Sequence, residues 1–171
     1  MAKTKDKFSQ IAFMTVNESA ANTLTFNGMT VFSNILTPKA ILIHRISYII
    51  LDDQIDKILA DADVLTFGLS GDDQMANVLF SDARVYDMHS VGFHDAGTTA
   101  VDWLFWESPK IFDFNALPGG GKLVPADRIF MFVKGASLAT AVSMSARFDF
   151  TLVDLSATEY IELAQALRVL T

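Results

Sequence analysis

The chain has 171 residues, of which 51% are hydrophobic and 19% charged, so it can bury the core of one domain over residues 1–171. Its formal net charge of −7 argues against a broad nucleic-acid surface, because phosphate contacts need clustered lysine and arginine. The absence of cysteine excludes disulfides, thiolate metal ligands and cysteine nucleophiles.

No apolar run reaches the roughly 20 residues that span a bilayer. The N-terminus lacks the apolar segment of a secretory signal, so we expect a soluble protein made in the cytosol. Lys3, Lys5 and Lys7 form a basic cluster there, and residues 1–8 are expected to be a flexible N-terminal arm. Alternatively, this arm contacts phosphate, lipid headgroups or a neighbouring subunit. Three charges give only weak affinity per chain, but the affinity increases when an assembly presents many copies of the arm.

The first half of the chain is rich in short apolar runs with few helical patterns. The sequence contains 14 phenylalanines, and their clustering in such runs favours strands. Asn27-Gly28 predicts a hairpin or bulge. We expect strands over residues 9–16, 24–32, 40–51, 64–69 and 84–93, with a short one over 77–80. The strand 40–51 is apolar on both faces, which predicts a central position in a sheet.

One helix is expected among these strands, over residues 53–62. Ile55, Ile58 and Leu59 would share one face, and Asp53 is the candidate N-cap. Because this helix is short, it is interpreted as an insertion.

The second half continues with strands. We expect them over residues 101–106, 110–114, 128–134 and 142–152, with a loop over 117–125 and a turn over 135–139. The run Gly119-Gly120-Gly121-Lys122 lacks the second glycine spacing and the following Ser or Thr of a phosphate loop, so it is interpreted as a loop between strands.

The last thirty residues carry the clearest pattern. From Val142 to Leu152, apolar residues at even positions alternate with polar ones, which predicts a half-buried antiparallel strand. Ser156 and Glu159 form a capping box that begins a helix over residues 156–170, and Leu155 with Tyr160 predicts a hydrophobic staple. The whole pattern indicates an all-β antiparallel sandwich of eight or nine strands, with a short inserted helix and a C-terminal helix.

The residues that could bind a metal are His89 and His94 with Asp87. Asp87 and His89 share a face of an extended strand, whereas His94 follows its end, and a site needs three or four convergent ligands. Half-exposed histidines at a strand end are therefore the favoured interpretation. We assign no metal and no cofactor.

No residue is predicted to be catalytic, and we do not expect an enzyme. His44 in the central strand is interpreted as a hydrogen-bonded core residue or an interface contact. The pairs Asp52-Asp53 and Asp72-Asp73 are interpreted as solvated acids in turns, because adjacent side chains point apart.

Two groups of residues are candidates for an interface. Trp103 and Trp106 have opposite parity on an extended strand, so at least one would point away from the core, toward a subunit interface or a sugar. Tyr160, Leu163 and Leu167 share one face of the C-terminal helix, which would cover its own sheet or a neighbour.

Together these features resemble the single jelly-roll major capsid proteins of icosahedral viruses. The shared features are the eight-strand count, the apolar strand 40–51, the small helical insertion, the late glycine-rich loop and the alternating last strand. The resemblance implies an eight-stranded jelly roll without an active site. Its function would be to self-associate into capsomers of a closed shell, alone or with other capsid proteins, in a virion after synthesis in the host cytoplasm.

The chain lacks the long arginine-rich arm that many such proteins use to neutralise a packaged genome. The resemblance therefore implies little direct nucleic-acid binding and a possible contact of the N-terminal arm with an inner membrane. Two alternatives stay open. One is a carbohydrate- or receptor-binding β-sandwich, such as a trimeric spike or lectin-like module, that uses Trp103 or Trp106. The other is a cupin-like metal enzyme that uses His89 and His94, although the paired histidines of cupins are absent.

Overall fold

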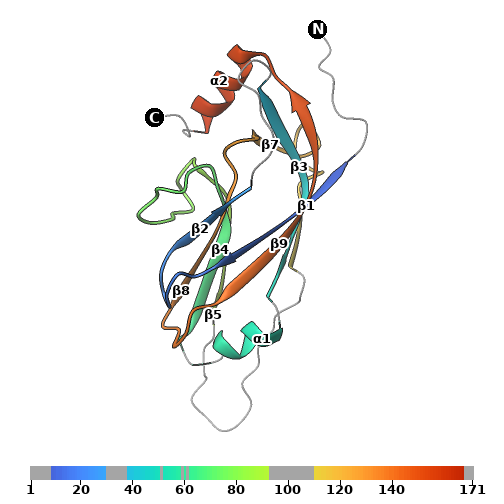
Figure 1. The fold of residues 1–171 in the computed structure, drawn as a ribbon. Helices are drawn as coiled ribbons and strands as arrows, with labels where there is room; N and C mark the ends of the chain where they lie inside the picture. Colours follow the sequence, from blue (N-terminus) through green and yellow to red (C-terminus); the bar gives the residue numbers. More distant parts are fainter. Residues whose placement is uncertain are drawn as a thin grey trace.

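The structure is a computed structural model that describes residues 9–29, 38–50, 52–58, 60, 62–92 and 110–167. In these ranges the chain forms nine strands, two α-helices and one 3-10 helix (Figure 1). The strands are β1 (Gln10–Asn17), β2 (Thr25–Gly28), β3 (Lys39–Ile49), β4 (Val64–Ser70), β5 (Val85–Gly92), β6 (Lys110–Asp113), β7 (Lys122–Pro125), β8 (Phe130–Ala136) and β9 (Ser143–Asp154). The helices are α1 (Asp52–Ile55), the 3-10 helix η1 (Asp56–Ile58) and α2 (Ala157–Ala166).

The strands form two antiparallel sheets. Sheet A has the order β1-β9-β3-β6, and β7 also pairs with β3. Sheet B has the order β2-β8-β4-β5. Every strand pair in both sheets is antiparallel. The predicted all-β sandwich of antiparallel strands is confirmed.

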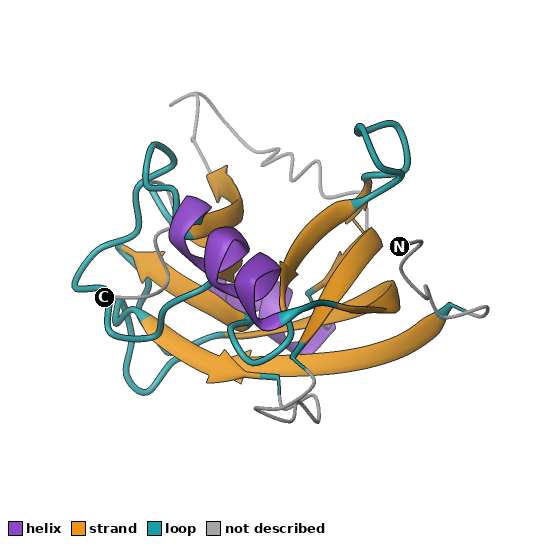
Figure 2. Cartoon of the chain, turned by 90° about the horizontal axis from the view of Figure 1, so that it is seen from above, coloured by secondary structure: helices purple, strands orange, loops and turns teal. Residues whose placement is uncertain are grey.

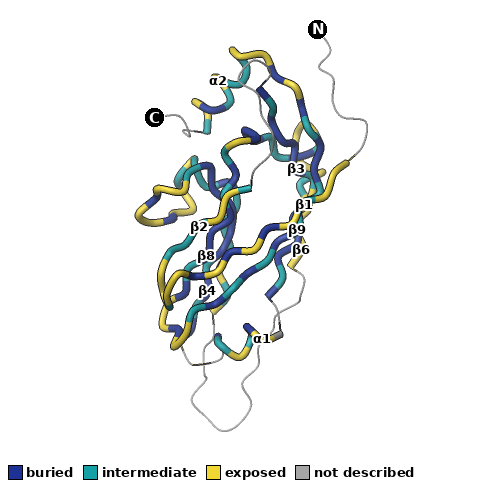
Figure 3. The backbone as a smooth tube through the Cα atoms, viewed as in Figure 1, coloured by how far each residue is buried: buried dark blue, intermediate teal, exposed yellow. Residues whose placement is uncertain are grey.

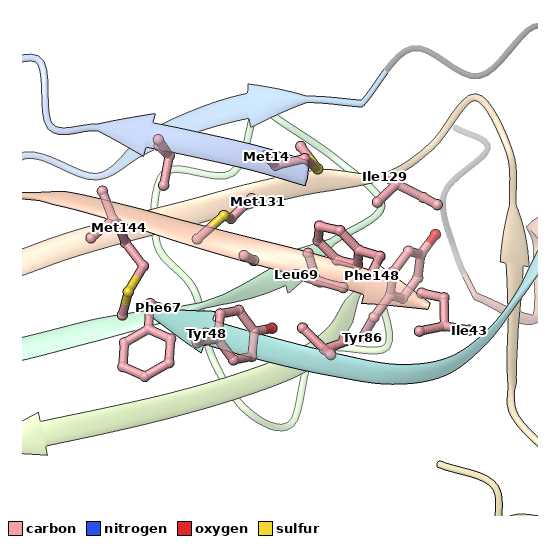
Figure 4. Packing of buried hydrophobic residues seen from close by; sticks show 14 of the residues in the cluster. Met14, Ile43, Tyr48, Phe67, Leu69, Tyr86, Ile129, Met131, Met144 and Phe148 are labelled. Atoms are coloured by element: carbon pink, nitrogen blue, oxygen red, sulfur yellow. The ribbon is translucent and has the colours of Figure 1, made fainter. Parts of the chain in front are cut away.

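The core lies between the inner faces of the two sheets. Tyr48 of β3 packs against Phe67 of β4, with ring centroids 5.0 Å apart. Figure 4 shows these two rings together with Met144 and Phe148 of β9 and Leu69 of β4. Eight residues among those labelled there are at most 1% exposed: Ile43, Tyr48, Phe67, Leu69, Ile129, Met131, Met144 and Phe148. Apolar burial on this scale is the main favourable contribution to folding.

The prediction for the last strand is confirmed in β9 up to Phe150, because the even positions from Met144 onward are buried and the odd ones are partly exposed. The alternation then fails, since both Thr151 and Val153 are buried. Beyond Phe150 the outer face of the strand is covered too. Val153 joins Leu155, Ala40 and Leu42 in a second apolar cluster.

Helix α2 provides that cover. Tyr160 and Leu163 pack against the second cluster, and Ala164 is fully buried in the main core. Figure 2 shows α2 lying across the end of the sheets, and Figure 3 shows that its two sides differ in exposure. The predicted capping box is present, with the Glu159 amide donating to Ser156 Oγ and the Ser156 amide donating to Glu159 Oε2.

The inserted helix is shorter than predicted. The helix expected over residues 53–62 starts at Asp52 and its last 3-10 turn ends at Ile58, so Asp53 lies inside it and does not cap it. The Asp63 carboxylate accepts a hydrogen bond from the Ala60 amide at 2.9 Å. Ala62 has a φ of +66°, a left-handed conformation that a helix cannot continue through.

Three other predictions are corrected. Asn27 and Gly28 form neither a hairpin nor a bulge, because both pair regularly with β8. Residues 77–80 are not a strand but part of a turn, in which the Asp82 amide donates to the Leu79 carbonyl. Of the loop expected over 117–125, residues 122–125 are strand β7. Pro125 is the last residue of β7, where the lack of an amide donor is tolerated.

Two bulges interrupt the regular pairing. The register of β3 with β9 shifts between Ile43 and Arg45, at His44. The register of β4 with β5 shifts between Leu69 and Ser70, and Tyr86 is the extra residue on β5. A bulge redirects the side chains on either side of it. The candidate polar sites of the molecule lie at these two positions.

Gly68, one residue before the second bulge, should not tolerate a larger residue. A Cβ atom at this position would lie 2.0 Å from the Asp87 carbonyl oxygen, which belongs to the backbone and cannot move aside. We expect Gly68→Ala to lower the free energy of unfolding by about 3 kcal/mol or more. Gly92→Ala is the control, because a Cβ there would meet its nearest atom at 3.5 Å, an ordinary contact. Urea denaturation of both variants checks this, and equal losses would contradict it.

Candidate functional site

The candidate metal residues Asp87 and His89 lie on the inner side of β5, toward β3 of sheet A. His89 Nε2 is 2.8 Å from Asp87 Oδ1, so the prediction that the two share a face is confirmed. Asp87 Oδ2 accepts a hydrogen bond of 2.8 Å from the hydroxyl of Tyr48. The His89 ring stacks on Phe112 of β6, with centroids 3.6 Å apart and an interplanar angle of 14°. We call Tyr48, Asp87 and His89 the inter-sheet network.

Sequence reasoning did not identify Tyr48, because it reads as one more aromatic residue in an apolar strand. Burial raises the pKa of the Tyr48 hydroxyl well above its usual value, and the Asp87 carboxylate raises it further. Tyr48 is therefore a fixed proton donor. The hydrogen bond crosses from sheet A to sheet B, so the network holds the two sheets together.

The inter-sheet network occupies both oxygens of Asp87, which leaves them engaged within the chain. His94, the third candidate ligand, lies outside the described residues. Within the described ranges, no group of three or more His, Cys, Asp or Glu residues could hold a metal ion.

Lys122 of β7 makes a second connection between the sheets. Its Nζ donates to the backbone carbonyl of Tyr86 and lies 5.9 Å from the centroid of the Tyr86 ring. Burial lowers the pKa of Lys122. The Tyr86 hydroxyl, by contrast, is buried with no hydrogen-bond partner. Tyr48 and Tyr86 thus form a natural pair for comparison, since one hydroxyl is satisfied and the other is not.

His44 lies at the bulge of β3 and anchors the glycine-rich loop. Its Nδ1 is 2.8 Å from the Gly120 carbonyl oxygen, and its Nε2 is 3.1 Å from Thr151 Oγ1. Because a carbonyl only accepts, Nδ1 must carry a proton. Both ring nitrogens are engaged in structural hydrogen bonds, as the interpretation of His44 as a hydrogen-bonded residue expects.

The outer face of sheet A carries a charged centre. Arg45 donates to Asp149 Oδ2 through Nε at 2.8 Å and Nη2 at 2.5 Å, and Arg147 Nε donates to Asp149 Oδ1 at 3.1 Å. Burial alone would raise the pKa of Asp149, but the two arginines outweigh it and lower the pKa. A shallow hollow of about 510 Å³ lies over this centre, between Ile11 on one side and Asp113 and Asn115 on the other.

Large apolar side chains remain exposed on both edge strands of this face. Phe13 of β1 is 75% exposed, Ile11 of β1 is 54% exposed and Ile111 of β6 is 53% exposed. The other exposed large apolar residues in the described ranges are Leu79, Phe80, Leu117 and Ile161. A single exposed apolar residue is normal on a protein surface. Here Ile11 and Phe13 lie on the same strand, and Leu79 and Phe80 are adjacent in one loop.

The interface candidates on α2 make contacts within their own chain. Tyr160 and Leu163 pack on the second apolar cluster, and Leu167 packs against the main core. The Tyr160 hydroxyl donates to Asp127. The helix thus covers its own sheets and leaves Ile161 exposed. Any contact of this helix with a neighbouring subunit stays a prediction.

Several predicted site residues lie outside the described ranges. They are Trp103 and Trp106, and Lys3, Lys5 and Lys7 of the N-terminal arm. No helix in the described part of the chain is both long and apolar enough to cross a membrane. No protein-family model matches the chain, and no curated protein matches it.

The two tyrosines should respond differently to loss of the hydroxyl. Tyr48→Phe removes a donor from the partly buried Asp87 carboxylate, so we expect it to lower the free energy of unfolding by about 1.5–3 kcal/mol. Tyr86→Phe removes a buried hydroxyl without a partner, and we expect a change below about 1 kcal/mol or a small gain. Urea denaturation measures both. Equal losses would show that the hydrogen bond to Asp87 does not carry the effect.

Asp149 should contribute to stability in a pH-dependent way. Because its pKa is lower in the folded chain, its contribution is complete above the unfolded pKa of about 3.9 and is lost as the pH falls through the folded pKa. The wild type should exceed Asp149→Asn in unfolding free energy at pH 6, and the difference should shrink toward pH 3. Denaturation curves across this range check it. A constant difference would contradict the assignment.

Proposed function

We propose that this chain is a viral structural protein, a single jelly-roll capsid subunit that assembles into the capsomers of an icosahedral shell. The observation that carries the proposal is the order of the strands in the two sheets. The exposed apolar side chains give it further support.

The strand order supports a jelly roll when β6 and β7 are counted as one position, since both pair with β3. The nine strands then occupy eight positions. The first pairs with the last (β1 with β9), and the second with the seventh (β2 with β8). The third pairs with the sixth (β3 with β6 and β7), and the fourth with the fifth (β4 with β5). This is one long antiparallel hairpin, and rolling it up adds the β3–β9 and β4–β8 pairs.

Capsid subunits are one of the classes that use this architecture, and their function resides in surfaces rather than in a reaction centre. The described polar clusters of this chain fit such a role. The inter-sheet network and His44 make hydrogen bonds that fix the sandwich, and Ile11 and Phe13 stand exposed beside the charged centre of sheet A. In a shell, contacts between neighbouring subunits would cover exposed apolar side chains such as these.

Assembly of the purified chain tests the proposal. We expect light scattering after size exclusion to detect species larger than a dimer as the concentration rises, and negative-stain microscopy to show capsomers or shell fragments. Species that never exceed a dimer would overturn the proposal. A discrete trimer that binds glycans would favour the receptor-binding alternative instead.

A surface variant should separate assembly from folding. Ile11→Ser combined with Phe13→Ser removes apolar surface that is already exposed, so we expect an unchanged unfolding transition and a smaller assembled fraction. The conservative variant, Ile11→Val with Phe13→Leu, should assemble like the wild type. An unchanged assembled fraction in the serine variant would exclude this face from the contacts.

A further inference from the structure

The loop between β4 and β5, residues 71–84, carries a pair of exposed apolar residues. Leu79 is 55% exposed, and Phe80, at 81%, is the most exposed of the large apolar side chains described. Figure 1 shows this loop, in green, projecting sideways from the body of the sandwich. We call Leu79 and Phe80 the knob. Because exposure of two adjacent large apolar side chains costs solubility, their position calls for a partner.

The knob is held in place by its own loop. The Asp82 amide donates to the Leu79 carbonyl at 3.0 Å, which closes a turn around Phe80. Arg84 then clamps the loop, since Nη2 lies 2.7 Å from Asp82 Oδ2 and Nη1 lies 2.8 Å from Asp72 Oδ2. A loop whose backbone is already held in place loses less conformational entropy on binding, so the backbone of the knob is preorganised for a contact.

The loop is also attached to the sandwich by buried side chains just before the knob. Met75 is 6% exposed and Val78 is 7% exposed. Figure 3 shows the buried and exposed stretches side by side within this loop. The loop thus has an inward part that folds with the chain and an outward part that does not.

A small apolar hollow lies directly beside the knob, on the outer face of sheet B. It has a volume of about 170 Å³, and its lining includes Asn77, Val78, Met88, Phe132, Lys134 and Ala136. An apolar cavity of about 150 Å³ is large enough to bind benzene in another protein. The hollow therefore has room for one phenyl ring, which is the side chain that the knob offers.

The charges around the knob and the hollow are complementary. The loop carries Asp72, Asp73 and Asp82 against the single cation Arg84, and Asp73 is exposed. The hollow is lined by one charged residue, Lys134. A knob placed in the hollow of another copy would bring Lys134 close to these aspartates. An acidic rim also disfavours an anionic lipid surface as the partner of the knob.

We propose that Phe80 of one copy of this chain inserts into the hollow of a second copy, which returns the same contact through a two-fold axis. The reciprocal arrangement is supported by position, because Asn77 and Val78 line the hollow and the knob comes directly after them. A donor and an acceptor side by side on one patch form an isologous pair. This inference rests on the proposed function, since it names one contact of the assembly.

Crosslinking tests the contact directly, and the chain is suited to it because it contains no cysteine. A Phe80→Cys variant is mixed with an Ala136→Cys variant under oxidising conditions, and mass spectrometry identifies the mixed disulfide. We expect mixed dimers, because the Ala136→Cys copy keeps its own Phe80, and insertion of this ring into the hollow of the Phe80→Cys copy holds the two thiols together. Phe13→Cys mixed with Ala136→Cys is the matched control, because Phe13 is nearly as exposed but lies on β1. Absence of the mixed disulfide, or equal crosslinking in the control, would overturn the inference.

Affinity provides the second measurement. Phe80→Ser should keep the wild-type unfolding transition and weaken two-copy association about tenfold or more in sedimentation velocity, as expected for an aromatic hot spot. Lys134→Glu should weaken it as well. If the wild type assembles into shell fragments and Phe80→Ser does so equally well, the knob contact is wrong and the proposed function stands. If crosslinked dimers form but nothing larger does, the contact stands and the shell is overturned.

Discussion

The antiparallel pairing of β3 with β9 is the constraint on which the rest of the structure depends. It runs from Lys39 opposite Asp154 to Ile49 opposite Ser145, and it is the longest strand pair in the described chain. Both β6 and β7 are added to the free side of β3, and β1 is added to the free side of β9. The same pairing places Arg45 opposite Asp149 and leads the chain from β9 directly into α2. Strands β3 and β9 must therefore pair before sheet A can form. This pairing joins residues that are far apart in sequence.

The bulges explain how a regular sandwich acquires polar sites. On the side of β3 away from β9, two strands pair with it in turn, and neither pairs with His44, because β6 ends at Asp113 and β7 begins at Lys122. His44 fills the gap between them by binding the Gly120 carbonyl of the intervening loop. At Tyr86 the extra residue lets the Tyr86 side chain enter the core beside Asp87, which regular pairing with Leu69 already places on the inner side of β5, where it meets Tyr48. At each bulge a side chain stabilises the irregular backbone: His44 binds the Gly120 carbonyl, and Lys122 Nζ donates to the Tyr86 carbonyl.

The sequence pattern predicted those features that depend on neighbouring residues. The alternation of β9 up to Phe150, the central position of β3 and the capping box at Ser156 are all local patterns, and all are present. What could not be predicted depends on distant partners. Residues 122–125 look like a loop until β3 is there to pair with them, and Thr151 looks solvent-exposed until His44 and α2 cover that end of β9. The inter-sheet network could not be predicted either, because neither strand alone indicates that Tyr48 will face Asp87.

Phe132 and Phe80 illustrate why exposure is decided by loops more than by strand parity. Phe132 alternates with the core residues Met131 and Val133, so it points to the outer face of sheet B, yet it is fully buried. It packs beside Phe26, at 6.1 Å between ring centroids, and lines the same hollow as Val78. Two residues after Val78, Phe80 stands in solvent. One loop thus buries apolar surface on its own sheet and presents apolar surface outward. The ion pairs of Arg84 with Asp82 and Asp72 link the outward half of this loop to its start beside β4.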